Sequence, residues 1–376
     1  MLRVWFNYGA TGATARLRRQ VFPGERRLRK VIFSISGALG IHRLFASLYR
    51  HQPVVLTFHG VTAENPGHIC NHEGLHLHLP IFTRLMEHVA RHYRPVPLLR
   101  VVDWLDGNGA VPDRAVVVTF DDGFRNVLTH AAPVLHRLGI PATLFVATDF
   151  VYGGEMLWPD RLMGALALTR ERSIEVEWNH QAHTLDVSSD ERKIEANTQL
   201  LAVLKALPQV ERLALLARVI ERLGVQTSLL ASAWDGFHPL EPGELRGLTA
   251  LGVSVGSHTC SHPIVSRLAP ADARRELAES KRLIEESTGT PCLEFAYPNG
   301  GPRDFNQETR RHVMAAGYRC AVTTIKRRVS RSDQCFEIPR CTLTHNQVSA
   351  AEFAAEVSGF PGALRSLRTR AAPALG

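Results

Sequence analysis

Two short clusters of side chains in the 376-residue sequence could together perform metal-assisted chemistry. The first holds the adjacent carboxylates Asp121 and Asp122 in the run TFDDG, and the second holds His258 and His262 in the run SHTCSH. Two histidines and one carboxylate can bind a divalent metal ion and leave a coordination position open. A second carboxylate beside the ligand can act as a base. The set therefore suits activation of water for attack on an acyl carbon.

Each cluster follows a short run rich in β-branched residues, at residues 115–119 and 253–255. Each run predicts a buried strand that ends where the polar cluster begins. In α/β folds, ligands and catalytic groups collect at the carboxyl ends of parallel strands. We therefore expect both clusters at that edge of a sheet.

The rest of the chain alternates between predicted strands and predicted helices. Further strands are predicted over residues 54–58, 142–146, 292–296, 319–323 and 336–343. Helices are predicted over residues 82–92, 127–138, 245–251, 270–287 and 306–316. Repeated β-then-α units imply a parallel sheet with helices outside it. About seven parallel strands of this kind predict an α/β fold, an irregular (β/α) barrel rather than an open sheet.

The alternation stops between about residues 152 and 241. Two helical runs there, at residues 190–207 and 209–223, predict a helical insertion over or beside the barrel. We expect three parts in the chain: a basic helical leader over residues 1–50, a catalytic domain over residues 51–361 that contains the insertion, and a loose tail over residues 362–376.

Positive charge is concentrated at the N-terminal end. Residues 1–50 contain ten basic residues and one acid, a net charge of +9, so the remaining 326 residues carry about −1 of the total of +8. A nearly neutral body argues against nucleic acid as a partner. The leader is either a solvated helix or a segment that contacts anionic lipid headgroups.

The sequence also bears on location. Residues 31–46 are moderately apolar, but His42 and Arg43 interrupt them, and the stretch is too short to span a bilayer and lacks a convincing cleavage context. No signal peptide is evident, so we expect a cytoplasmic or membrane-peripheral protein. The histidines at positions 72, 76 and 78 show no metal-ligand spacing tied to a carboxylate and are expected on the surface or in loops.

Three motifs together resemble those of the polysaccharide deacetylases that carry the nodulation-protein-B homology domain. They are TFDDG, SHTCSH and FAYPNG at residues 295–300, in the order typical of the family, and the resemblance covers about residues 52–360. It implies a hydrolase that uses a divalent metal to cleave N- or O-acetyl groups from sugars. It also implies that Asp121 is the base and that Asp122, His258 and His262 bind the metal. Zn²⁺ suits these donors, and Co²⁺, Ni²⁺, Mn²⁺ and Fe²⁺ tolerate them.

The third motif implies two further roles. The backbone N–H of Asn299 matches the family's donor to the developing oxyanion. The family usually has an Arg two residues before the proline of this motif, where this chain has Ala296. We expect Arg340, on a late strand, to form the ion pair with Asp121 instead; the alternative is an ordinary surface arginine.

Two histidines are candidates for the general acid. His59, in the run FHGV after the first strand, resembles the acid of family members with a similar third motif. His345, in the run LTH, matches other members. We favour His59 because it directly follows a buried strand. Arg340 and His345 are five residues apart, so in a regular strand they face opposite sides.

The leading interpretation is a metal-dependent deacetylase of hexosamine units in a polysaccharide or its lipid-linked precursor, with an acetylated glycan as its partner. Trp158, Asp160 and Trp234 could line its substrate groove, or the aromatic residues could belong to a core or lid. One alternative is a non-catalytic carbohydrate-binding protein on the same fold, which the intact ligand set disfavours. Another is a two-histidine, one-carboxylate iron oxygenase, which the paired aspartates disfavour.

Overall fold

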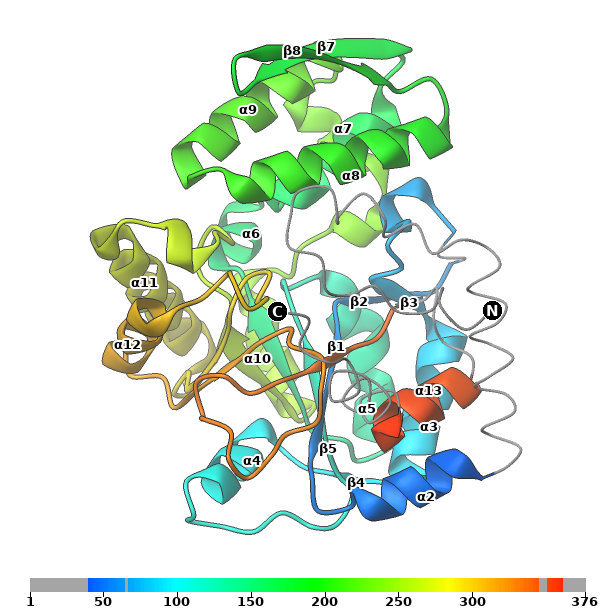
Figure 1. Cartoon of the computed structure of the whole chain (residues 1–376). Helices are drawn as coiled ribbons and strands as arrows, with labels where there is room; N and C mark the ends of the chain where they lie inside the picture. Colours follow the sequence, from blue (N-terminus) through cyan, green and yellow to red (C-terminus); the bar gives the residue numbers. More distant parts are fainter. Residues whose placement is uncertain (1–39, 65–66, 345–349, 361–376) are drawn as a thin grey trace, which may run out of the picture.

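A curled parallel sheet surrounded by helices forms the centre of the computed structural model, which describes residues 40–64, 67–344 and 350–360 (Figure 1). The spatial order of its strands is β11-β10-β9-β6-β5-β1-β12, and the short strand β4 (Arg94–Pro95) pairs with β5. The seven are β1 (Val54–Phe58), β5 (Ala115–Phe120), β6 (Ala142–Val146), β9 (Val253–Ser257), β10 (Glu294–Ala296), β11 (Cys320–Val322) and β12 (Cys341–Thr342). The predicted irregular (β/α) barrel is confirmed.

The two ends of this strand order approach each other. Val322 of β11 forms a parallel bridge with Ile338, three residues before β12, and β12 in turn pairs with β1. Of the predicted late strand over residues 336–343, only Cys341–Thr342 form a regular strand, and the chain passes from the bridge at Ile338 to the pairing of β12 with β1. This path carries Arg340 into the interior, where it is fully buried.

Strands β1, β5 and β6 are buried at every position. Such near-continuous apolar runs are typical of parallel strands that are covered on both faces. The covering helices are α3 (Leu79–His92), α4 (Leu98–Leu105), α5 (Ala132–Arg137), α6 (Thr148–Gly153), α10 (Leu245–Ala250), α11 (Pro270–Thr288) and α12 (Gln307–Ala315).

Two helices from opposite ends of the described chain pack together. Phe45 of α2 (Ile41–Leu48) contacts Phe360, just after α13 (Ala350–Ser358), with ring centroids 5.2 Å apart. The buried guanidinium of Arg328 donates to the backbone carbonyls of Tyr49 and Val357 and so ties these segments to the barrel. The last residues of the predicted leader thus pack on the body of the protein.

The remaining parts of the predicted leader and the tail over residues 362–376 lie outside the described residues. None of the helices in the described part of the chain has the length and apolarity that a membrane span needs.

The insertion over about residues 152–241 has its own apolar core. It contains α7 (Trp158–Leu168), α8 (Asp190–Ala206) and α9 (Gln209–Arg222), together with a β-hairpin of β7 (Ser173–Trp178) and β8 (Gln181–Asp186), drawn in green in Figure 1. The two predicted helical runs are α8 and α9, and the hairpin was not predicted. Side chains of β7 alternate between exposed and buried, and Asn179 and His180 both adopt the positive φ angles of a tight two-residue turn.

Candidate active site

The strand ends bring the predicted clusters to one edge of the barrel. Phe58 and Phe120 are paired in register, so His59 and Asp121 leave β1 and β5 at the same level. The backbone N–H of Asp121 donates to the carbonyl of Phe58 at 3.0 Å. In the same way, the N–H of His258 donates at 2.8 Å to the carbonyl of the last residue of β6.

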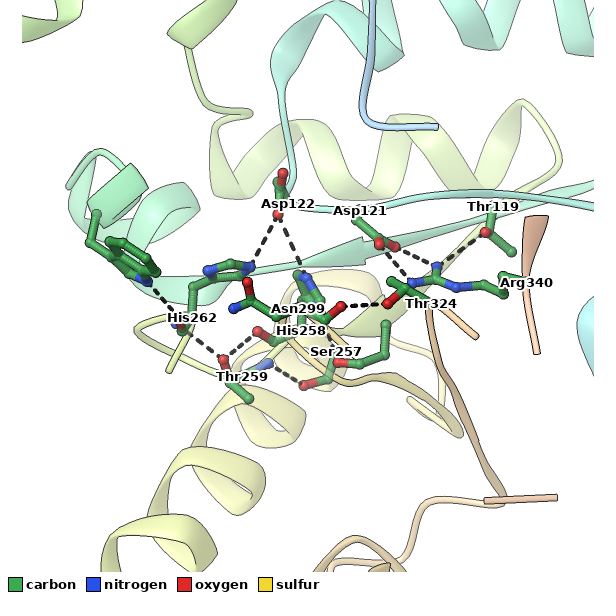
Figure 2. A network of polar contacts seen from close by, with 12 residues as sticks. Thr119, Asp121, Asp122, Ser257, His258, Thr259, His262, Asn299, Thr324 and Arg340 are labelled. Atoms are coloured by element: carbon green, nitrogen blue, oxygen red, sulfur yellow. Dashed lines mark hydrogen bonds and ion pairs between the residues drawn. The ribbon is translucent and has the colours of Figure 1, made fainter. Parts of the chain in front are cut away.

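Asp122, His258 and His262 form one buried group (Figure 2). Oδ1 of Asp122 lies 3.6 Å from Nε2 of His258 and 3.5 Å from Nε2 of His262. Donor atoms that each lie about 2 Å from a shared ion have separations of this size. Among the described residues, these three are the His, Cys, Asp or Glu side chains whose donor atoms lie close enough together to hold one metal ion.

The protonation states of the two histidines also suit a metal ion. Nδ1 of His258 lies 2.7 Å from the carbonyl oxygen of Ala296, which fixes the proton on Nδ1 and leaves the Nε2 lone pair facing Asp122. Burial lowers the pKa of His258 to about 4 and holds that of His262 well below its usual range, so both rings are neutral. Burial and the nearby charges of Asp121 and Asp160 raise the pKa of Asp122 well above normal. A bound cation would favour its ionised form.

The loop that carries both histidines is held by a helix. Glu276 of α11, 8% exposed, accepts hydrogen bonds through Oε2 from the backbone N–H groups of Cys260 and Ser261, at 2.8 and 3.0 Å. Its Oε1 accepts from the Ser261 hydroxyl at 2.6 Å. Glu276 was not predicted from the sequence, because no local pattern marks a helix carboxylate that packs on a distant loop.

Arg340 forms the ion pair expected with Asp121. Its two terminal nitrogens each lie 2.7 Å from one carboxylate oxygen, and its Nε donates to the carbonyl of Thr323 at 2.9 Å. Arg340 is fully buried, so the alternative of a surface arginine was wrong. Burial alone would raise the pKa of Asp121, but the guanidinium outweighs it and the pKa falls to about 2. Asp121 is therefore ionised and fixed in orientation at neutral pH.

His59 is the single residue between β1 and the short strand β2 (Gly60–Thr62), close enough to Asp121 and Arg340 to interact electrostatically with both. Its Nδ1 is inaccessible to solvent and has no hydrogen-bond partner among the described residues. The next residue must be Gly60, because a Cβ there would lie 2.2 Å from Nδ1 of His76. His76 is 3% exposed and its Nδ1 lies 2.9 Å from Nδ2 of Asn126, so the expectation of a surface histidine was wrong for His76.

Ala296 and Asn299 of the third motif lie near His258, although they are far from it in the sequence (Figure 2). Asn299 has a positive φ of 61°, and its carbonyl accepts from the Thr324 hydroxyl at 2.6 Å (Figure 2). Its side-chain Nδ2 is buried without a partner in the described part of the chain. Ala296 of the same motif holds His258 through its carbonyl, as described above. His345 lies outside the described residues.

The start of α7, in the insertion, contacts the loop that carries His258 and His262. Trp158 is 3% exposed, belongs to the insertion's core and donates from Nε1 to the carbonyl of His262 at 3.3 Å. The Oδ2 atom of Asp160 is buried and lacks a partner among the described residues. Burial and the charge of Glu73 raise the pKa of Asp160 to about 7. Trp158 is thus a core residue of the insertion that also contacts the ligand loop.

Comparisons with known proteins point to one family. A family model described as polysaccharide deacetylase matches residues 108–321. The Bacillus subtilis (strain 168) protein YxkH, which carries a provisional polysaccharide deacetylase name, is 27% identical over 135 residues, 35% of this chain and 47% of that protein. The match thus spans about half the length of that curated relative.

Two solved structures share the fold. The Streptococcus pyogenes deacetylase PplD, in complex with acetate, is 15% identical with a TM-score of 0.55, covering 82% of this chain and 98% of that one. IcaB from Ammonifex degensii is 19% identical with a TM-score of 0.52, covering 82% and 97%. At these identities the likeness shows the shared fold alone.

Proposed function

Because the chain belongs to the polysaccharide deacetylase family, we propose that it is a metal-dependent hydrolase that removes acetyl groups, chiefly N-acetyl groups, from hexosamine units of a polysaccharide or its lipid-linked precursor. One observation carries the proposal: the buried group of Asp122, His258 and His262 lies next to an aspartate that Arg340 holds ionised. A divalent ion, with Zn²⁺ as the first choice, would polarise the acetyl carbonyl and acidify a water molecule there.

In this reaction Asp121 accepts the proton of the attacking water. Arg340 orients both carboxylate oxygens, but the same ion pair lowers the pKa of Asp121 to about 2 and makes it a weak base. A weak base can take this proton only if the water is itself acidified. Removal of the metal should therefore abolish the function of Asp121 without displacing its side chain.

Two other groups act on the acetyl group and the leaving amine. The backbone N–H of Asn299 would donate to the carbonyl oxygen as it gains negative charge. The imidazolium of His59 would protonate the amine nitrogen as its bond to the acyl carbon breaks.

Substitution of His59 by Ala is expected to keep the metal and to lower kcat by about 10²–10⁴-fold. Burial lowers the pKa of His59 below its ordinary value of 6.5, so the acid form is lost as pH rises through that lower value. The wild-type rate should fall along this alkaline limb, and the limb should be absent in His59→Ala. We expect His345→Ala to have a mild effect. The opposite ranking of the two variants in paired pH–rate profiles, with both folded and metal-loaded, would assign the acid to His345.

Acetate release from a panel of N- and O-acetylated glycans tests the proposed function. Release from N-acetylated hexosamine oligomers, with one free amine per acetate, is the expected result. The rival function, carbohydrate binding without catalysis, predicts glycan binding and no acetate. The retained set of Asp121, Asp122, His258 and His262 favours the enzyme, because a binding protein has no need of a base beside a metal site.

We also propose that the basic leader contacts anionic membrane surfaces. Residues 1–39 contain eight basic residues and one acid, a charge of +7, and electrostatic attraction of this kind weakens with salt. Deletion of residues 1–39 leaves α2 in place against α13. The truncated protein is expected to keep its activity on a soluble substrate and to lose sedimentation with anionic liposomes at low salt. Equal sedimentation of the full-length and truncated proteins would contradict the membrane contact.

A further inference from the structure

Trp158 connects the insertion to the loop that carries the ligand histidines. It is the first residue of α7 and part of the insertion's apolar core. Its indole N–H donates to the backbone carbonyl of His262, 104 positions further along the chain. The hydrogen bond is buried, so water does not readily replace the indole as donor.

The backbone of His262 depends on such support. His262 has a φ of 56°, a left-handed conformation that residues with a side chain seldom adopt. Its N–H donates to the hydroxyl of Thr259 at 3.1 Å, and its carbonyl accepts from Trp158. A strained residue persists when the surrounding structure fixes it on several sides. Loss of either contact should free His262 to relax, which would move its ring away from Asp122.

A buried cation in turn holds Trp158. The guanidinium carbon of Arg212, on α9, lies 5.2 Å from the centroid of a Trp158 ring, and Arg212 is fully buried. Arg212 donates to three neutral acceptors, the carbonyls of Leu204 and Leu207 and the side-chain oxygen of Gln209, at 3.0, 3.2 and 2.7 Å. Attraction to the indole face adds to these bonds. The positive charge also polarises the indole, which strengthens its N–H as a donor.

We propose that Trp158 is a positioning residue for the metal site, through which the insertion fixes the backbone of His262 and raises the affinity of the site for a divalent ion. The insertion then has a function besides covering the barrel. This inference rests on the metal site of the proposed function and is independent of which glycan is the substrate.

The test compares Trp158→Phe with the matched control Trp178→Phe. Phenylalanine keeps an aromatic ring in the core but has no N–H donor. Trp178 lies in the same core, is 8% exposed and stacks on His183 within the hairpin, with ring centroids 3.6 Å apart. Zn²⁺ affinity of the metal-free full-length chain is measured by competition with a fluorescent chelator. Trp158→Phe is expected to bind Zn²⁺ about five- to tenfold more weakly, and Trp178→Phe within about twofold of wild type.

A second variant covers the case in which Trp158→Phe does not fold. Incorporation of 3-benzothienylalanine at position 158 keeps the bicyclic ring and replaces the N–H with sulfur. Wild-type Zn²⁺ affinity in this variant, or an equal loss of affinity in Trp178→Phe, would overturn the inference. The titration needs no substrate, so a wild-type chain that binds Zn²⁺ tightly but releases no acetate would contradict the proposed function and leave this inference standing.

Discussion

Replacement of Asp121 by Asn should leave the metal bound and lower kcat by about 10²–10⁴-fold. Asparagine has the same shape as aspartate but cannot accept the proton of the attacking water. Asp121 is not part of the ligand group, so the affinity for Zn²⁺ should change little. The measurements are metal content by elemental analysis and kcat for acetate release.

The controls for Asp121→Asn follow from the burial of Arg340 and from the adjacent position of Asp122. Arg340 would lose its anionic partner while remaining fully buried, which costs about 3–5 kcal/mol for a buried ion pair. Thermal unfolding must therefore show that the assayed protein is folded. Asp122→Asn is the matched comparison, because it makes the same chemical change at the adjacent position and should lose the metal. Loss of the metal from Asp121→Asn, with retention in Asp122→Asn, would reverse the two roles.

Replacement of His258 by Ala should remove metal and activity together. The substitution deletes one of three donors and the hydrogen bond from Nδ1 to the carbonyl of Ala296 that orients it. Outer contacts of this kind alone typically contribute about 10–100-fold to metal affinity, and loss of the ligand itself should cost more. Zn²⁺ titration and acetate release are measured on the same preparation.

His312→Ala serves as the control for this loss. His312 lies on α12, where its Nε2 is 3.7 Å from Glu308 one turn away, and it is not part of the ligand group. Its removal should leave both Zn²⁺ affinity and kcat unchanged. Stoichiometric metal at wild-type affinity in His258→Ala would refute the assignment of His258 as a ligand.

Much of the barrel could be predicted from the sequence because its strands are continuous apolar runs. The positions of Asp121 and His258 followed from the same reasoning, since the polar residue after such a run must lie at the carboxyl end of a strand. The ion pair of Arg340 with Asp121 was expected because Ala296 replaces the family's arginine. The assignment of catalytic and ligand roles to these residues remains a prediction that the variants above test.

Other features depend on contacts that no local pattern records. His76 is buried because Gly60, on a different strand, leaves room for its ring. Glu276 and Trp158 contact the loop of His258 and His262 through hydrogen bonds between segments that are distant in sequence. The hairpin of β7 and β8 is different, because its signal was present: Ile174, Val176 and Trp178 alternate with polar residues before a two-residue turn. The two helical runs that follow it, at residues 190–207 and 209–223, favoured a helical interpretation of the insertion.

Acetate release by the wild-type chain, metal-stripped and then reloaded, tests the central claim most directly. The substrate is an N-acetylated hexosamine oligomer, and the released acetate and the new free amines are both counted. We predict no release from the stripped protein and full recovery with one equivalent of Zn²⁺ per chain, with acetate and amine produced in equal amounts. Stoichiometric Zn²⁺ and measurable glycan binding without any acetate, across the panel of acetylated glycans and metals, would contradict the account and favour a carbohydrate-binding protein.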